Sequence, residues 1–216
     1  ARSWLGDVRS IVRVARAGAR WSLDRGGIRA AGNAPALPNH RGLRIEGAVE
    51  RFVLDDWLAL RGEGSSSAAG GDGNALSDYL QAANVRVGTF ELAGYRWSDV
   101  RGLLQATTAG WRVDVDGPGA AGQVFIPEQF TGSQALRATL ARLVLEKVES
   151  SDAGSSEATR DPRDIPNLQV HVGELRVGTR TLGTFDLQAT RVPQGIRFDN
   201  VSIHGASAHG AGQGEW

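Results

Sequence analysis

Residues 182–205, with the sequence LGTFDLQATRVPQGIRFDNVSIHG, decide the fold class. Apolar residues alternate with polar ones in the FDL run at 185–187, and they do so again in the IRF run at 196–198. A period of two gives a pleated strand one apolar and one polar face. Between the two runs, the PQG segment at 193–195 consists of residues that favour turns. The stretch therefore predicts a meander of antiparallel strands, and it contains no catalytic group.

Two short phrases recur along the chain and indicate internal repeats. RVGT at 86–89 recurs at 176–179, and LQAT at 104–107 recurs at 187–190. Repeated units that stack on one another contact mainly their neighbours. We therefore predict a mostly β fold, an elongated and twisted antiparallel sheet of repeating hairpins.

Polar, low-complexity segments divide the repeats. The GEGSSSAAGGDGN run at 62–74 cannot bury enough apolar area to become ordered by itself. The predicted organisation is a partial first β unit at 1–61, a Gly/Ser-rich loop plus a short helix at 62–84, a second β unit at 85–149, a polar loop at 150–164, and a truncated third β unit at 165–216.

One or two short helices are expected among the strands. Asp55 is a suitable N-cap for one or two helical turns over 55–60. Leu76, Tyr79 and Leu80 have helical spacing and predict a short helix over 75–83.

The stretch LRATLARLVL at 136–145 fits either a helix or a strand. Leu136 and Leu140 lie in one alternating run, whereas Leu143 and Leu145 are shifted by one position. A single extra residue in a strand produces such a shift. We predict a strand with a β-bulge near residues 141–142.

Composition excludes several functional classes. Lys+Arg and Asp+Glu both total 24, so no bulk charge draws the chain to nucleic acid. The absence of cysteine excludes disulfides, thiol nucleophiles and zinc–thiolate sites. The chain has no Met and begins at Ala1 in a strand-like sequence, so we expect it to be a piece of a longer polypeptide. No apolar run approaches the ~20 residues that span a bilayer.

No set of residues forms a convincing catalytic, metal or cofactor site. His204 and His209 are only two ligands, and turn histidines explain them better. Asp114 and Asp116 share a strand face and are better explained as solvated edge carboxylates than as an acid–base pair. The glycines at 117–119 lack the helix that a phosphate-binding loop needs. We therefore do not expect an enzyme.

The strongest candidate site is the set of apolar side chains on the alternating strands. They could line a groove or fill the core of a β-sandwich, and pattern alone favours the sandwich. Only 6% of residues are aromatic, so these faces are mostly aliphatic, which suits fluid chains better than defined small molecules. The set comprises Val85, Val87, Phe90, Leu92, Val113, Val115, Val124, Ile126, Leu168, Val170, Val172, Phe185, Leu187, Ile196, Phe198, Val201 and Ile203.

Several phrases, in order and spacing, resemble the large AsmA-like proteins of the YhdP type. Together they cover most of the chain and fit an internal or C-terminal-side segment. They are LDDWL at 54–58, WRVDVDGP at 111–118, GQVFIP at 122–127, LRATLARLVL at 136–145, DPRDIP at 161–166, LGTFDL at 182–187 and the closing residues 210–216.

The resemblance implies a long periplasmic β-sheet folded lengthwise, like a taco, into an open groove lined by the apolar set. It implies phospholipids as ligands, with acyl chains carried between the inner and outer membranes. It also implies an N-terminal helix, absent here, that anchors the parent protein in the inner membrane. The resemblance brings no catalytic motif and no cofactor. The alternative is a structural or adhesive β-repeat scaffold without a lipid ligand, and a carbohydrate-active β-solenoid is the least favoured class.

Overall fold

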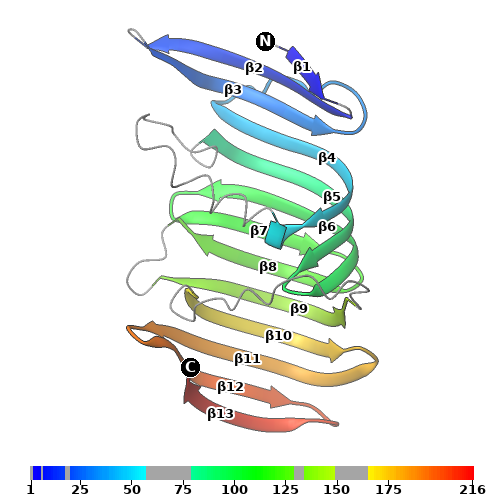
Figure 1. The fold of residues 1–216 in the computed structure, drawn as a ribbon, viewed down its shortest axis with the longest axis vertical. Helices are drawn as coiled ribbons and strands as arrows, with labels where there is room; N and C mark the ends of the chain where they lie inside the picture. The colour runs from blue at the N-terminus through cyan, green and yellow to red at the C-terminus, as the bar shows by residue number, and fades with distance from the viewer. Residues whose placement is uncertain (1, 6, 18–19, 57–78, 129–133, 149–164) are drawn as a thin grey trace. The chain divides into compact units, whose positions relative to one another are not determined.

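The computed structural model describes residues 2–5, 7–17, 20–56, 79–128, 134–148 and 165–216 (Figure 1). Nearly all of these residues lie in strands, which confirms the mostly β prediction. The strands are β1 (Arg2–Leu5), β2 (Val8–Ala17), β3 (Arg20–Ala30), β4 (Gly42–Val53), β5 (Leu80–Leu92), β6 (Tyr95–Thr107), β7 (Gly110–Asp116), β8 (Ala120–Pro127), β9 (Ala135–Lys147), β10 (Asn167–Val177), β11 (Arg180–Val192), β12 (Gly195–His204) and β13 (His209–Glu215).

The chain forms two compact units. The first comprises Ala1–Ala93 with Ser98–Ala106, and the second comprises Gly94–Trp97 with Thr107–Trp216. In the first unit the strands follow one another from β1 to β6, and in the second from β7 to β13, in sequence order. Among the described residues, strands make their extensive contacts with their sheet neighbours, so each unit is a single layer.

Three neighbouring pairs of strands are parallel. They are β3–β4 and β4–β5 in the first unit and β9–β10 in the second. Parallel neighbours require a crossover connection in place of a tight turn. Those connections are residues 31–41, 54–79 and 148–166, which include the predicted polar loops, and much of the latter two lies outside the described residues. The sheet is therefore mixed, and the predicted antiparallel pairing is interrupted at these three steps.

Paired bulges keep the apolar side chains on one face. Opposite β8, strand β9 has one extra residue, Ala141, which confirms the bulge predicted near 141–142. Strand β10 has a matching irregularity after Val172, and a Cβ built on Gly173 would lie 3.0 Å from the Ala141 carbonyl oxygen. An extra residue reverses the alternation. Leu143 and Leu175 therefore return to the face that is apolar before the bulge.

A similar close backbone approach occurs in the first unit, between the parallel strands β4 and β5. A Cβ on Gly88 in β5 would lie 2.7 Å from the carbonyl oxygen of Glu50 in β4, so Gly88 is the counterpart of Gly173. The RVGT phrases are not structurally equivalent, because residues 86–89 lie within β5 whereas 176–179 end β10 and enter the following turn. The LQAT phrases do lie at matching places, near the ends of β6 and β11.

The helix predictions are only partly met. Residues 54–56 form a helical turn, and the rest of the predicted segment 55–60 lies outside the described residues. The Asp55 carboxylate accepts a hydrogen bond from the Ala93 backbone N–H at 2.6 Å. The helix predicted over 75–83 is wrong from Leu80 onward, where β5 begins, while 75–78 are not described. Leu80 pairs with buried Leu43 of β4, and this pairing overrides the helical spacing.

Candidate functional site

The second unit presents a continuous apolar face. Directly paired residues of neighbouring strands point to the same side of a sheet, so the strand register defines rows of side chains across the face. We call the following two rows the apolar face. One row is Val113, Val124, Ala138, Val170, Leu187 and Val201, and the other is Val115, Gly122, Leu140, Val172, Phe185 and Ile203.

The remaining predicted residues of this unit lie toward one end of the strands. Ile126 is paired with Trp111 on β7. Leu168 and Phe198 both lie opposite Ala189, from the two strands that flank β11. Ile196 is almost fully buried, at 1% exposure. The structure thus brings the predicted residues of β7, β8, β10, β11 and β12 onto neighbouring strands.

The four predicted residues of the first unit lie together on β5. Val85 is paired with Gly47 of β4, and Val87 with Val49. Phe90 stacks on Phe52 of β4 with ring centroids 6.2 Å apart, and Leu92 ends β5.

Part of the apolar face packs against itself. Ala138, Leu140, Val172 and Leu175 form a buried cluster, and Val172 has no exposed surface. Val124, Val170 and Phe185 are half-buried against this cluster. The buried residues therefore hold the neighbouring strands together, and the half-buried ones supply the accessible part of the apolar face.

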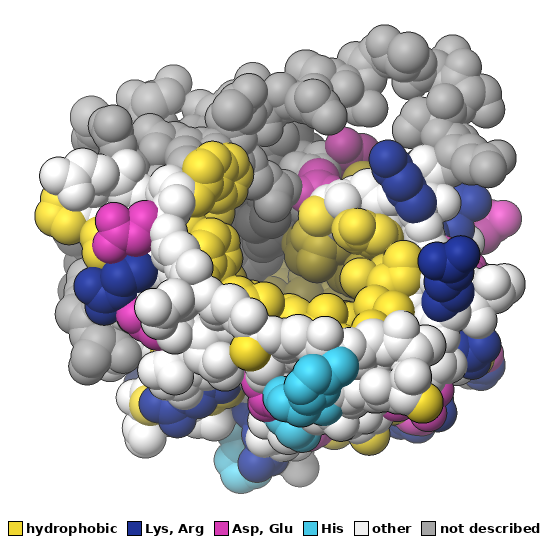
Figure 2. Space-filling view, turned by 90° about the horizontal axis from the view of Figure 1, so that it is seen from below, with side chains coloured by type: hydrophobic (Ala, Val, Ile, Leu, Met, Phe, Trp, Pro, Cys, Tyr) yellow, Lys and Arg dark blue, Asp and Glu magenta, His cyan; other side chains and the backbone are white. Residues whose placement is uncertain are grey.

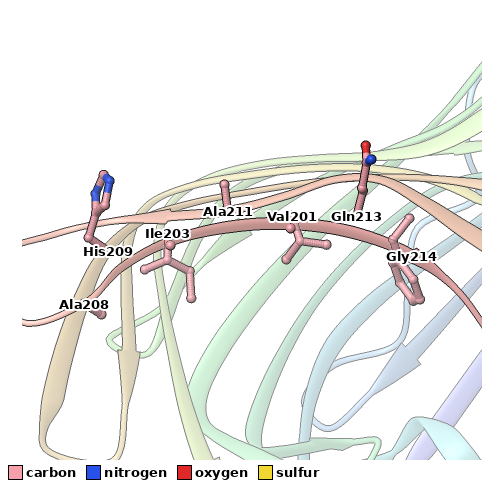
Figure 3. Close-up of a pocket in the computed structure, with 10 residues that line it drawn as sticks. Val201, Ile203, Ala208, His209, Ala211, Gln213 and Gly214 are labelled. Carbon is pink, nitrogen blue, oxygen red and sulfur yellow. The ribbon is translucent and has the colours of Figure 1, made fainter.

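The apolar rows end on glycines in β13. Gly212 lies opposite Val201, and Gly210 lies opposite Ile203. With Gly214 they leave a pocket of about 440 Å³ beside Phe198, Val201 and Ile203. Figure 3 shows Val201 and Ile203 on the inner side of the arched strands, with Ala211 and Gln213 of β13 pointing the opposite way. Hydrophobic side chains gather in a hollow seen from the β13 end (Figure 2).

The opposite face of the second unit is polar. The His171 Nδ1 atom lies 2.7 Å from Asp186 Oδ1 on the neighbouring strand, so His171 points away from the apolar side. On β7 and β8, Gln123 donates a hydrogen bond to Asp114 at 2.8 Å. Alternation therefore separates the two faces as the sequence predicts.

Two carboxylates of the described residues, Asp99 and Asp199, are each held by an arginine. The hydrogen bond from Arg86 keeps the pKa of Asp99 below its usual range, although burial opposes this shift. Hydrogen bonds from Thr190 and then Arg197 lower the pKa of Asp199 in the same way. These carboxylates are held ionised, which makes them poor proton donors or acceptors near neutral pH.

The weak metal and acid–base candidates gain little from the structure. His204 and His209 lie opposite each other on β12 and β13, with ring centroids 4.9 Å apart. Within the described ranges, no three His, Asp or Glu side chains come together as they would around a metal ion. Among the described residues, no helix is long and apolar enough to cross a membrane.

Two parts of the face were not predicted. Ala138 and Leu140 of β9 alternate clearly but were not assigned to the site, although they lie in its two rows and in the buried cluster. The glycines of β13 were also missed, and their signal is the strict alternation of glycine with other residues in HGAGQGE at 209–215.

Comparison with known families gives one result. The family model described as YhdP protein matches residues 7–216, which is nearly the whole chain. No curated protein and no solved structure matches it.

Proposed function

Because the chain belongs to the YhdP family, we propose that it is a segment of a bridge-like lipid transport protein. Its apolar face would hold the acyl chains of phospholipids and let them slide along the sheet. The same proposal places the parent protein in the periplasm, anchored in the inner membrane by a helix in another segment, with delivery toward the outer membrane.

One observation supports this proposal above all. The apolar face runs across neighbouring strands of a single layer, and no second sheet of described residues packs on it. In a β-sandwich such a face would be covered by a partner sheet. Here much of it stays half-buried, with Val170, Leu187, Val201 and Ile203 among the accessible residues. Contiguous apolar surface that stays partly accessible is typical of a binding face.

The chemistry of the face fits an acyl chain. Its residues are mainly Val, Leu and Ile, so it offers dispersion contacts without fixed polar partners. A ligand that makes no directional bonds can move along such a wall at little cost. The glycines of β13 widen the space at one end to about 440 Å³, within the range of ligand pockets.

The test uses two neighbours on β11 that point to opposite faces. Leu187 lies between Val170 and Val201 on the apolar face, whereas Gln188 pairs with Gln169 and Asn200 on the polar face. Leu187→Glu should reduce the phospholipid that copurifies with the protein, measured by mass spectrometry. Gln188→Glu adds the same charge on the other face and should leave the lipid content unchanged.

A second variant protects the test against misfolding. A Cβ at Gly212 meets no atom within 4 Å, so Gly212→Val should fold normally while it narrows the pocket. We expect less bound lipid in this variant, together with a thermal unfolding temperature no lower than that of the wild type. If the wild-type protein carries no lipid, and photo-crosslinkers placed on the apolar face capture none, the scaffold alternative replaces the proposal.

A further inference from the structure

The hairpin of β2 and β3 extends past the strand beside it (Figure 1). Pairing between β3 and β4 begins only at Arg25, opposite Gly42. Residues 20–24 of β3 therefore have no partner in β4, although residues 20–23 pair with β2. A two-stranded ribbon buries little apolar surface by itself. The β2–β3 hairpin therefore projects beyond the start of β4 as a two-stranded ribbon.

The projecting ribbon exposes large apolar side chains. Val14 is paired with Leu23, and Arg16 with Trp21, so all four point to one side of the ribbon. Trp21 is 67% exposed and Val14 is 51% exposed. An indole ring combines a large apolar surface with one N–H donor, and such rings are enriched where a bilayer meets water.

The ribbon also concentrates positive charge in a chain that is neutral overall. Residues 8–25 contain five arginines, at 9, 13, 16, 20 and 25, and a single acidic residue, Asp24. Asp24 is contacted by Arg25 at 3.1 Å, by Arg41 at 3.3 Å and by Arg13 at 3.8 Å. Burial opposes its ionisation, but hydrogen bonds from Arg25 and Arg41 lower the pKa of Asp24. By formal charge, residues 8–25 therefore carry five positive groups against one negative group, a net of +4.

The arginines lie on both sides of the ribbon. Arg13 and Arg25 are paired and point to one side, whereas Arg16 points with Trp21 to the other. A flat protein surface would contact only one side of a ribbon. Lipid headgroups surround a hairpin that inserts between them, so they can contact arginines on both sides. This arrangement favours a lipid surface over an acidic protein.

We propose that the β2–β3 hairpin is a docking element for a bilayer that contains anionic phospholipid. Trp21 and Val14 enter the headgroup region, and the arginines bind lipid phosphates. The inference does not require lipid to be carried on the apolar face of the second unit.

Vesicle cosedimentation tests the proposal. The protein should bind phosphatidylcholine vesicles that contain phosphatidylglycerol and bind pure phosphatidylcholine vesicles only weakly, with a loss of binding as salt rises. Each basic residue near an anionic surface is worth about a fivefold change in partitioning. Arg13→Gln combined with Arg16→Gln should therefore weaken binding by roughly thirtyfold.

Trp21→Ala has a matched control in Trp216→Ala. Trp216 is similarly exposed, at 62%, but follows Glu215 and lies outside the basic ribbon. Trp21→Ala should weaken vesicle binding and remove the blue shift of tryptophan fluorescence, whereas Trp216→Ala should preserve both. Circular dichroism should be the same for the two variants.

Three outcomes would overturn the proposal. The first is equal binding by the two tryptophan variants, and the second is binding that ignores phosphatidylglycerol. The third is tight binding to a polyglutamate peptide that survives Trp21→Ala, which would assign the ribbon to an acidic protein. Leu187→Glu should leave vesicle docking intact, so a failure of lipid carriage and a failure of docking can be told apart.

Discussion

Two glycines of the second unit should respond in opposite directions to the same substitution by alanine. Gly212 lies in β13, and a Cβ there would meet no atom within 4 Å. Gly183 lies in β11 with φ of +97°, and a Cβ there would lie 2.2 Å from the His204 carbonyl oxygen. The backbone at position 212 therefore accepts a larger residue, whereas the backbone at position 183 requires glycine.

The magnitudes follow from these two environments. Gly212→Ala restricts the unfolded chain without strain, which should raise the free energy of unfolding by about 0.5–1 kcal/mol. Gly183→Ala forces a side chain into the left-handed region at a cost of about 1–2 kcal/mol. The clash with β12 adds roughly 1–3 kcal/mol of overpacking. We expect a net destabilisation of about 2–5 kcal/mol.

Equilibrium urea unfolding, followed by circular dichroism, measures both changes, with the m-value checked for constancy. Gly210→Ala is a second control in β13, because its Cβ position is equally empty. A Gly183→Ala variant as stable as the wild type would contradict the close approach of β12 to Gly183. Equal destabilisation by Gly212→Ala and Gly183→Ala would contradict it as well, because only Gly183 lies against the backbone of a neighbouring strand.

Two further predictions concern the buried cluster and the Asp199–Arg197 ion pair. Leu140→Ala removes a side chain that is only 8% exposed at the centre of the buried cluster, and it should lower the free energy of unfolding by about 2–5 kcal/mol in the same urea assay. Asp199 has a folded pKa below its ordinary value of 3.8, owing to Thr190 and Arg197. Its stabilising contribution is therefore complete above that value and lost as pH falls through the lowered pKa. Arg197→Gln should flatten the acid limb of the stability profile, whereas an unchanged profile would contradict the pairing.

The positions of most strands could be read from local pattern. Alternation marks which residues of β10, β11 and β12 share a face, because a pleated strand has a period of two whatever it pairs with. The bulge at Ala141 was predictable for the same reason, since an extra residue leaves a visible shift in the spacing of leucines. The helix predicted across Leu80 failed because pairing with Leu43 outweighs a short run of helical spacing.

The candidate site was only partly predictable. The seventeen predicted residues lie on β5, β7, β8, β10, β11 and β12, but alternation alone gave no reason to separate buried Val172 from half-buried Leu187. The recurring phrase RVGT also misled, because it equates Gly88, which lies within β5, with Gly178, which follows the end of β10. The true counterpart of Gly88 is Gly173, and both are defined by a carbonyl oxygen on a parallel neighbour that local sequence does not specify.

The sequence by itself determined that this protein is mostly β-sheet, with one aliphatic and one polar face on its strands. Those properties depend on residues two positions apart, so they can be recognised in the local sequence. Only the tertiary structure decided that three neighbouring pairs are parallel and that the described strands of each unit form one layer. It also placed the bare glycines of β13 at the end of the apolar rows. The partner of each strand, and any layer that covers its face, come from segments that are distant in the sequence. The period of two is the same whether the apolar face is covered or open.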